Sequence, residues 1–279
     1  MKQSLLAVKA WMVLCGLLAF AYGTAANPTP ATEESRIQTA GPVSKPEIRK
    51  LIRQARNGSV EAYETLAACY RDGNGLPQSY FNMFMMYRLA CKKTGRDVLE
   101  ILETLDEEHP FRLLIEILNH KEIDRVPSEL VERLRKASPA DGHIFDAICS
   151  VELGKDPKAA LRLLKQAEAE GSEMACIFQM LVLDQMNAPS GYRKALHHHA
   201  KRFPSLYIQL GESYRTDTAD KKELRQVVKY YCRADLRGML SGTDARKLLS
   251  ACSRLEAITN KAICDPAERT RLELLSSND

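Results

Sequence analysis

Apolar side chains between residues 59 and 95 recur every three or four positions, which is the period of an α-helix that packs on one face. The two stripes consist of Tyr63, Leu66, Ala67 and Tyr70, and then of Met83, Met86, Tyr87 and Ala90. Gly73, Asn74 and Gly75 lie between the stripes and tolerate the positive φ angles of a tight turn. We therefore predict two short helices packed as an antiparallel hairpin.

The same helical period runs from Pro46 almost to the end of the chain. No stretch alternates apolar and polar residues for long enough to predict a strand. The pattern predicts about fourteen helices between Pro46 and Leu275. We therefore expect an all-α fold, and an array of about 230 residues is long enough to bury a core between neighbouring helix pairs.

The first helix pair also contains a distinctive motif, Leu66-Ala67-x-x-Tyr70-x-x-Gly73-x-Gly75-Leu76 followed by Met86-Tyr87-x-x-Ala90-Cys91. This motif resembles the Sel-one-like repeat, a short relative of the tetratricopeptide repeat. It differs from the family pattern at Ala67, where the family has glycine, and at Asn82-Met83, where the family has a Lys-Ala pair. The resemblance implies a right-handed α-solenoid of antiparallel helix hairpins that serves as a binding scaffold and not as an enzyme.

Further copies of the motif occur later in the chain at roughly the family period. The best late copy runs from Tyr207 to Gly238, and its Leu210-Gly211-x-x-Tyr214 matches the family without substitution. By this resemblance Tyr214 is expected to be a buried ring between the two helices of its repeat. Another copy lies at residues 156–171, and the other copies between residues 97 and 201 are degenerate, so the array is expected to be irregular there.

The N-terminal region has the pattern of a secretory signal, because Lys2 and Lys9 accompany an apolar run and small residues lead up to Ala26. The apolar run is shorter than the ~20 residues of a membrane-spanning helix, although an uncleaved anchor is the alternative. We predict a signal peptide over residues 1–26, removed near Ala26, and a disordered, proline-containing linker over residues 27–45. The mature protein would then be periplasmic or secreted, without a membrane span.

The remaining residues 46–279 are predicted to form the solenoid, with a capping helix at each end. Residues 46–58 resemble the second helix of a repeat whose first helix is missing. Residues 266–275 are predicted to form a last, charged helix. Such caps would cover the open ends of the core.

The chain has a formal net charge of +4, and positive and negative side chains are mixed along every predicted helix. No block of lysine and arginine has the density or the interleaved aromatic residues that nucleic-acid binding requires. We therefore expect no nucleic-acid partner and interpret the charges as a solvated helical surface.

Removal of the leader, with Cys15, would leave seven of the eight cysteines. None of them forms a Cys-x-x-Cys pair, so the sequence supports neither a thioredoxin-like site nor a zinc ribbon. Cys69 and Cys91 differ in axial position by roughly 10 Å in the predicted hairpin, which is too far for a disulfide. We expect the cysteines to be small buried apolar residues, and whether any pair forms a disulfide stays open.

No group of residues predicts a catalytic site, a metal site or a cofactor. The consecutive histidines 197–199 cannot converge on one metal ion, because adjacent helical residues point about 100° apart. A calcium loop that starts at Asp72 would need a glutamate in place of Met83 and a glycine in place of Pro77. The acidic residues lie among basic ones, so no pair of carboxylates is singled out for acid–base catalysis.

The residues that flank the packing stripe in the two best copies predict a binding surface. On the first helix of each copy they lie about 80 to 160° from the stripe, at 100° per residue. By resemblance to tetratricopeptide folds, this face would line the concave groove. The candidate partner-binding residues are Glu61, Glu64, Arg71, Ile208, Glu212 and Arg215. The alternative is that they are ordinary solvent-exposed residues, since helical arrays need not bind through the groove.

The main hypothesis is an exported scaffold or adaptor that binds a protein or peptide partner through the concave face of the array. One alternative is an envelope hydrolase that acts on peptide or glycan, for which the sequence offers no converging set of titratable groups. The other alternative is a purely structural spacer. The identity of the partner and the oligomeric state do not follow from the sequence.

Overall fold

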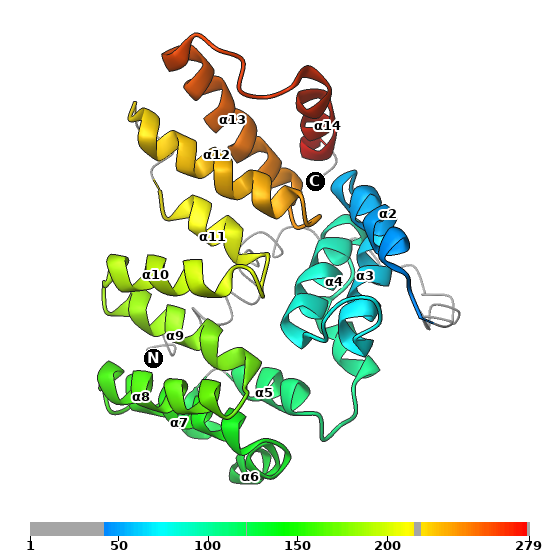
Figure 1. Cartoon of the computed structure of the whole chain (residues 1–279). Coiled ribbons are helices and arrows are strands. Elements are labelled where there is room, and N and C mark those ends of the chain that lie inside the picture. Colours follow the sequence, from blue (N-terminus) through cyan, green and yellow to red (C-terminus); the bar gives the residue numbers. More distant parts are fainter. Residues whose placement is uncertain (1–41, 121, 215–218, 278–279) are drawn as a thin grey trace. The chain divides into compact units, whose positions relative to one another are not determined.

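The computed structural model describes residues 42–120, 122–214 and 219–277, and the predicted signal peptide lies outside these ranges. The regular structure of the described residues consists of thirteen α-helices and two 3-10 helices, without a strand. Helices that are neighbours in sequence pack against each other, as in a helical repeat array (Figure 1). The all-α prediction is therefore confirmed for this part of the chain. None of the described helices is both long and apolar enough to cross a membrane.

The chain forms two compact units, which we call unit 1 and unit 2. Unit 1 contains residues 99–195, whereas unit 2 combines the described residues up to Val98 with those from Leu196 onward. The helices of unit 1 are η2 (Val98–Thr104), α5 (Pro110–Leu118), η3 (Ile123–Arg125), α6 (Ser128–Ala137), α7 (Pro139–Glu152), α8 (Pro157–Ala169), α9 (Glu173–Gln185) and most of α10 (Pro189–His199). The helices of unit 2 are α2 (Lys45–Arg56), α3 (Val60–Asp72), α4 (Tyr80–Thr94), α11 (Leu206–Glu212), α12 (Lys221–Asp235), α13 (Gly242–Thr259) and α14 (Pro266–Ser277).

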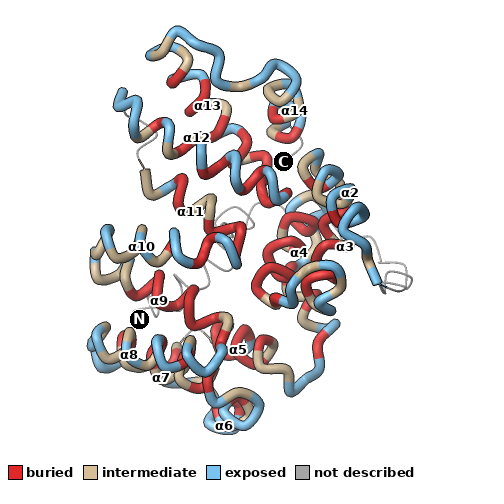
Figure 2. Tube along the Cα trace, viewed as in Figure 1, coloured by how far each residue is buried: buried red, intermediate tan, exposed pale blue. Residues whose placement is uncertain are grey.

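The predicted hairpin is present in unit 2 as α3 and α4. Ser59 and Ser79 precede these helices, and each side chain accepts a hydrogen bond from a backbone amide of the first turn. α3 ends at Gly73, whose φ of 66° is a left-handed conformation that glycine adopts without a steric penalty. Much of both helices is buried (Figure 2). The ring of Tyr63 is among the buried side chains.

The predicted late copy corresponds to α11 and α12, but its buried ring differs from the prediction. Tyr231 on α12 is fully buried, whereas Tyr214 is only partly buried. A Cβ atom at Gly211 would lie 2.4 Å from Cε2 of Tyr231, so the glycine leaves the space that this ring occupies. The expectation that Tyr214 is the core ring is therefore wrong, and Tyr231 takes that place.

Charged side chains connect the first and the last described helices in unit 2. Asp235, at the end of α12, is buried, and its Oδ2 accepts hydrogen bonds from Arg56 Nη2 at 2.8 Å and from Arg271 Nη2 at 2.6 Å. Arg271 on α14 also donates to the backbone carbonyl of Arg56 on α2 at 2.7 Å. Glu268 pairs with both arginines, at 3.0 and 2.8 Å. We call these four residues the α2–α14 clasp.

The clasp goes beyond what a linear array provides, because in such an array each repeat contacts only its neighbours. The backbone at the end of α12 also lies close to α2, since a Cβ atom at Gly238 would be 2.9 Å from Cβ of Ala55. Gly238 has a φ of 69°, so this close approach coincides with a left-handed turn. The two ends of the described chain are thus packed together within unit 2.

All seven cysteines of the described chain are free thiols. Cys69, Cys91, Cys176 and Cys252 are buried, which agrees with their expected role as small apolar residues. Desolvation raises the pKa of Cys252 to about 12, so its thiol is protonated at neutral pH and is a poor nucleophile.

Candidate interaction surface

Two of the three predicted binding residues on α3 already have partners in unit 2. Glu64 forms an ion pair with Arg96, which follows α4. Arg71 pairs with the adjacent Asp72, at 2.7 Å between Nε and Oδ1. Glu61 is exposed. These neighbouring charges weaken the field that Glu64 and Arg71 would present to a binding partner.

The predicted residues of the late copy differ in their surroundings. Glu212 on α11 pairs with Lys247 of α13 at 2.5 Å, and Ile208 is half-buried. Arg215 lies outside the described residues. Among the predicted residues that are described, no hydrogen bond or ion pair joins the members on α3 to those on α11. Their shared role in a concave groove stays a prediction.

Three tyrosines stack on one another between α11 and α12. The ring centre of Tyr230 lies 6.3 Å from that of Tyr207 and 5.9 Å from that of Tyr214, with interplanar angles of 10° and 18°. Aromatic rings at these separations attract each other. Tyr230 is buried, while Tyr207 and Tyr214 are partly exposed. The outer rings therefore fix the central ring and remain accessible to a partner.

Two basic side chains of α12 border this stack. The guanidinium carbon of Arg233 lies 5.7 Å from the ring centres of both Tyr207 and Tyr230, and Lys229 Nζ lies 5.2 Å from that of Tyr230. These are cation–π distances. Both side chains are exposed, and neither pairs with a carboxylate of a described residue. We call Tyr207, Tyr214, Tyr230, Lys229 and Arg233 together the tyrosine surface.

His197, near the end of α10, also belongs to unit 2 and contacts the stack. Its ring lies edge-on to Tyr230, with 5.3 Å between the ring centres. Desolvation, and next the positive charges of Lys229 and Arg233, lower the pKa of His197. Desolvation also raises the pKa of Tyr230. At neutral pH both rings are therefore uncharged, and the positive charge of the tyrosine surface comes from its lysine and arginine.

These side chains come from α12, from α11 and from the segment that follows α11. Tyr207 lies in the first turn of α11, whereas Tyr214 lies two residues beyond its end, so the rings on either side of Tyr230 are held by a helix and by the turn after it. On α12, Tyr230 and Arg233 are three residues apart and share a face. Tyr231 directly follows Tyr230 and points about 100° away from it around the helix axis, into the core. The Tyr-x-x-Arg spacing of Tyr230 and Arg233 on α12 is the part of this surface that the sequence alone indicates.

Unit 1 contains Ser172, Asp141 and His109, which are the three residue types of a hydrolase triad. Ser172 Oγ donates a hydrogen bond to Asp141 Oδ1 at 2.5 Å and accepts one from the Ala175 amide as the cap of α9. His109 Nδ1 accepts from the Phe111 amide as the cap of α5. In a catalytic triad the serine hydroxyl donates to the histidine. Here the hydroxyl donates to the carboxylate and is buried, and this geometry serves helix capping.

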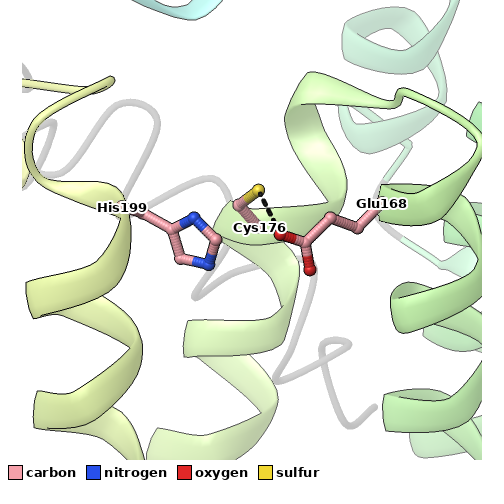
Figure 3. Close-up of side chains that lie close together, drawn as sticks. All are labelled: Glu168, Cys176 and His199. Atoms are coloured by element: carbon pink, nitrogen blue, oxygen red, sulfur yellow. Dashed lines mark hydrogen bonds between the residues drawn. The ribbon is translucent and has the colours of Figure 1, made fainter.

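Glu168 on α8 and Cys176 on α9 form a second polar contact in unit 1, which Figure 3 shows with its hydrogen bond dashed. The carboxylate accepts from Cys176 Sγ at 3.6 Å and from Gln179 Nε2 at 2.7 Å. His199, also labelled there, is a residue of unit 2 and not part of this pair. Metal centres of zinc type use three or four protein ligands, and the pair in unit 1 supplies two. We interpret the contact as a polar link between neighbouring helices.

Comparison of the chain with protein-family models, with curated proteins and with solved structures gave no match. The resemblance to Sel-one-like repeats therefore rests on the motif residues alone.

Proposed function

We propose that this protein is a helical scaffold that binds a protein partner through the tyrosine surface of α11 and α12. The observation that carries the proposal is the stack of three tyrosines bordered by two exposed cations without carboxylate partners among the described residues. Tyrosine and arginine are enriched among the residues that dominate binding energy at protein interfaces. Because the rings are already stacked, binding orders few additional side chains, which lowers its entropic cost.

The proposal keeps α11 as the binding element expected from the repeat motif but assigns the affinity to different residues. Glu212 is paired with Lys247, and therefore contributes less to a partner than Tyr207 and Arg233, which have no such neutralising contact. An envelope hydrolase is less well supported, since the serine–aspartate contact of unit 1 caps a helix. A purely structural spacer would have no use for a stacked and partly exposed aromatic surface. We further propose that the protein acts after export, in the periplasm or outside the cell, once its leader is removed near Ala26.

The test is a binding measurement with a matched pair of variants. A partner recovered by cross-linking in the native host is identified by mass spectrometry, purified and titrated against each protein. Tyr207→Ala combined with Tyr214→Ala should weaken binding at least tenfold, about the loss of one strong interface contact. The control, Tyr80→Ala combined with Phe145→Ala, removes two rings of similar exposure outside the tyrosine surface and should change the affinity less than twofold.

Two outcomes would overturn the proposal. One is an unchanged affinity in the Tyr207/Tyr214 variant while its circular dichroism and melting curve show a folded protein. The other is an equal loss in both variants. Failure to recover any partner under conditions that cross-link a known envelope complex would favour the spacer instead.

A further inference from the structure

The exposed side of α12 carries a regular row of positive charges. Lys221, Arg225, Lys229 and Arg233 follow one another at intervals of four residues, and all four are exposed. Residues four apart lie above one another on a helix, so the charges are spaced by about 6 Å along one face. Figure 2 shows how exposed and buried residues alternate along this helix. We call these four residues the α12 basic row.

No member of the α12 basic row pairs with a carboxylate of a described residue. Five other arginines of unit 2 do have such partners, namely Arg56, Arg71, Arg96, Arg269 and Arg271. Like charges four residues apart destabilise a helix, and the row contains three such pairs in succession. Within the described fold only Lys229 and Arg233 have a compensating contact, with the tyrosine rings. The remaining repulsion along the row points to a ligand of opposite charge.

The row leads directly to the tyrosine surface. Its last two members, Lys229 and Arg233, are the cations that border the stack of Tyr230 and Tyr207. We infer that the partner docks an acidic segment of polypeptide along α12, with its carboxylates on the basic row and an apolar or aromatic part against the tyrosines. This inference rests on the proposed function, because it identifies the chemistry of the partner at the same surface.

The spacing of the row defines the segment that fits it. A helix with a carboxylate at every fourth residue repeats its charge every ~6 Å, and an extended chain with a carboxylate at every second residue repeats it every ~6.6 Å. A segment of about 13 residues in a helix would cover the whole row, because α12 and the segment rise by the same ~1.5 Å per residue.

A single-stranded nucleic acid also offers regularly spaced negative charges, but the tyrosines favour a protein. Nucleic-acid binding without sequence preference uses aromatic faces on which bases stack. Tyr230 is buried, and its ring is already stacked with Tyr207 and Tyr214. The central ring is therefore not available for stacking with a base, and only the exposed parts of Tyr207 and Tyr214 are.

Helix α2 supplies a matched control in the same unit. Lys45, Arg49, Lys50 and Arg53 are also four exposed cations on one helix, and none forms a salt bridge with a carboxylate of a described residue, although Lys50 lies near Glu47. No tyrosine stack borders them in the described part of unit 2. Charge reversal of all four residues on α2 changes the net charge of the protein by the same amount as charge reversal of the α12 basic row.

The experiment measures binding of labelled synthetic peptides to the full chain by fluorescence anisotropy. The first peptide has about 13 residues with glutamate at every fourth position in an alanine-rich helix, to match the rise of α12. The second has glutamine in place of glutamate, and the third has the same composition with all glutamates at one end. Oligo(dT) and vesicles that contain phosphatidylglycerol are the probes for other partner classes. Salt is set at about 0.05 M and 0.15 M, because screening weakens charge contacts at the higher value.

The inference predicts that the spaced glutamate peptide binds at least tenfold more tightly than the glutamine peptide and more tightly than the clustered one. Lys221→Glu, Arg225→Glu, Lys229→Glu and Arg233→Glu together should abolish this preference, whereas the α2 reversal should leave it within about threefold. Circular dichroism identifies any variant that has not folded. If the charge-reversal variant of the α12 basic row does not fold, the same four residues are replaced by glutamine instead. This neutral variant should also lose the preference for the spaced glutamate peptide.

Three results would overturn the inference. They are equal losses in the α12 and α2 reversals, equal binding of the glutamate and glutamine peptides, and a tighter, row-dependent binding of oligo(dT) or of the vesicles. The Tyr207→Ala and Tyr214→Ala variant separates this inference from the proposed function. Suppose that this variant loses the native partner but that the unmodified protein shows no preference for acidic peptides. The tyrosine surface would then remain the proposed binding site, and the acidic segment would be rejected.

Discussion

Substitution of Asp235 by alanine tests whether the α2–α14 clasp holds the two ends of the described chain together. Its carboxylate is the shared acceptor of Arg56 and Arg271, whose side chains are 19% and 17% exposed. Removal of one partner from a buried ion pair costs about 3–5 kcal/mol, because the remaining charge is left without compensation. Glu268 still pairs with both arginines and is 45% exposed, so the loss should fall near the lower end, about 3 kcal/mol.

The assay is thermal unfolding followed by tyrosine fluorescence. Of the tyrosines in the described residues, only Tyr192 belongs to unit 1, so the signal reports mainly on unit 2. A loss of about 3 kcal/mol should lower the melting temperature by roughly 6–12 °C in a domain of this size. The control is Glu212→Ala, which removes an ion pair with Lys247 whose side chains are both more than 40% exposed. That change should cost no more than ~1 kcal/mol.

Equal shifts of the melting temperature in the two variants would refute this reasoning, because burial of the carboxylate would then contribute nothing. A second check uses the double variant of Asp235→Ala and Arg271→Ala. If the two residues act through one contact, the double variant should lose less than the sum of the single losses. Strict additivity would show that Asp235 and Arg271 do not stabilise the fold through their shared contact.

Three further results are expected. Tyr231→Ala should cost about 3–5 kcal/mol in a urea unfolding series, whereas Tyr214→Ala, a partly exposed ring, should cost clearly less; equal midpoints would contradict this assignment of the core. Gly211→Ala should cost about 1–3 kcal/mol in the same series through the contact with Tyr231, despite the higher helix propensity of alanine, and a gain in stability would contradict the packing. Mass spectrometry of the protein from its native host should show a chain that begins near Asn27, and an intact leader in the membrane fraction would favour an anchor.

Local features of the fold could be predicted from the sequence because they depend on local chemistry. The hairpin of α3 and α4 follows from apolar residues at helical spacing, and Gly73 ends α3 because a left-handed residue is needed there. Helix α2 begins where proline suits the first turn, and Ser44 and Glu47 form its capping box. These signals lie within a few residues of the structure that they specify.

Contacts between distant parts of the chain could not be predicted in this way. The repeat motif points to Tyr214 as the buried ring of the late copy, and only the packing of α12 against Gly211 shows that Tyr231 takes that place. Similarly, Arg56 and Asp235 are separated by 179 residues, and no helical period relates them. Glu64 was selected because of its position on a helix face, but its partner Arg96 lies beyond the next helix. The tyrosine surface was missed for the same reason, since its members come from two helices.

Site-specific photo-cross-linking is the most direct test of the claim that the tyrosine surface binds a protein. A photoreactive phenylalanine analogue is introduced at Tyr207, and separately at Leu153 of unit 1, which is 57% exposed and lies outside the tyrosine surface. We expect the Tyr207 position, irradiated in the native host, to yield one defined protein adduct whose cross-linked peptide is acidic. The Leu153 position should yield no such adduct. An adduct with the same protein only from Leu153, or from both positions alike, would show that the tyrosine surface is not the binding site.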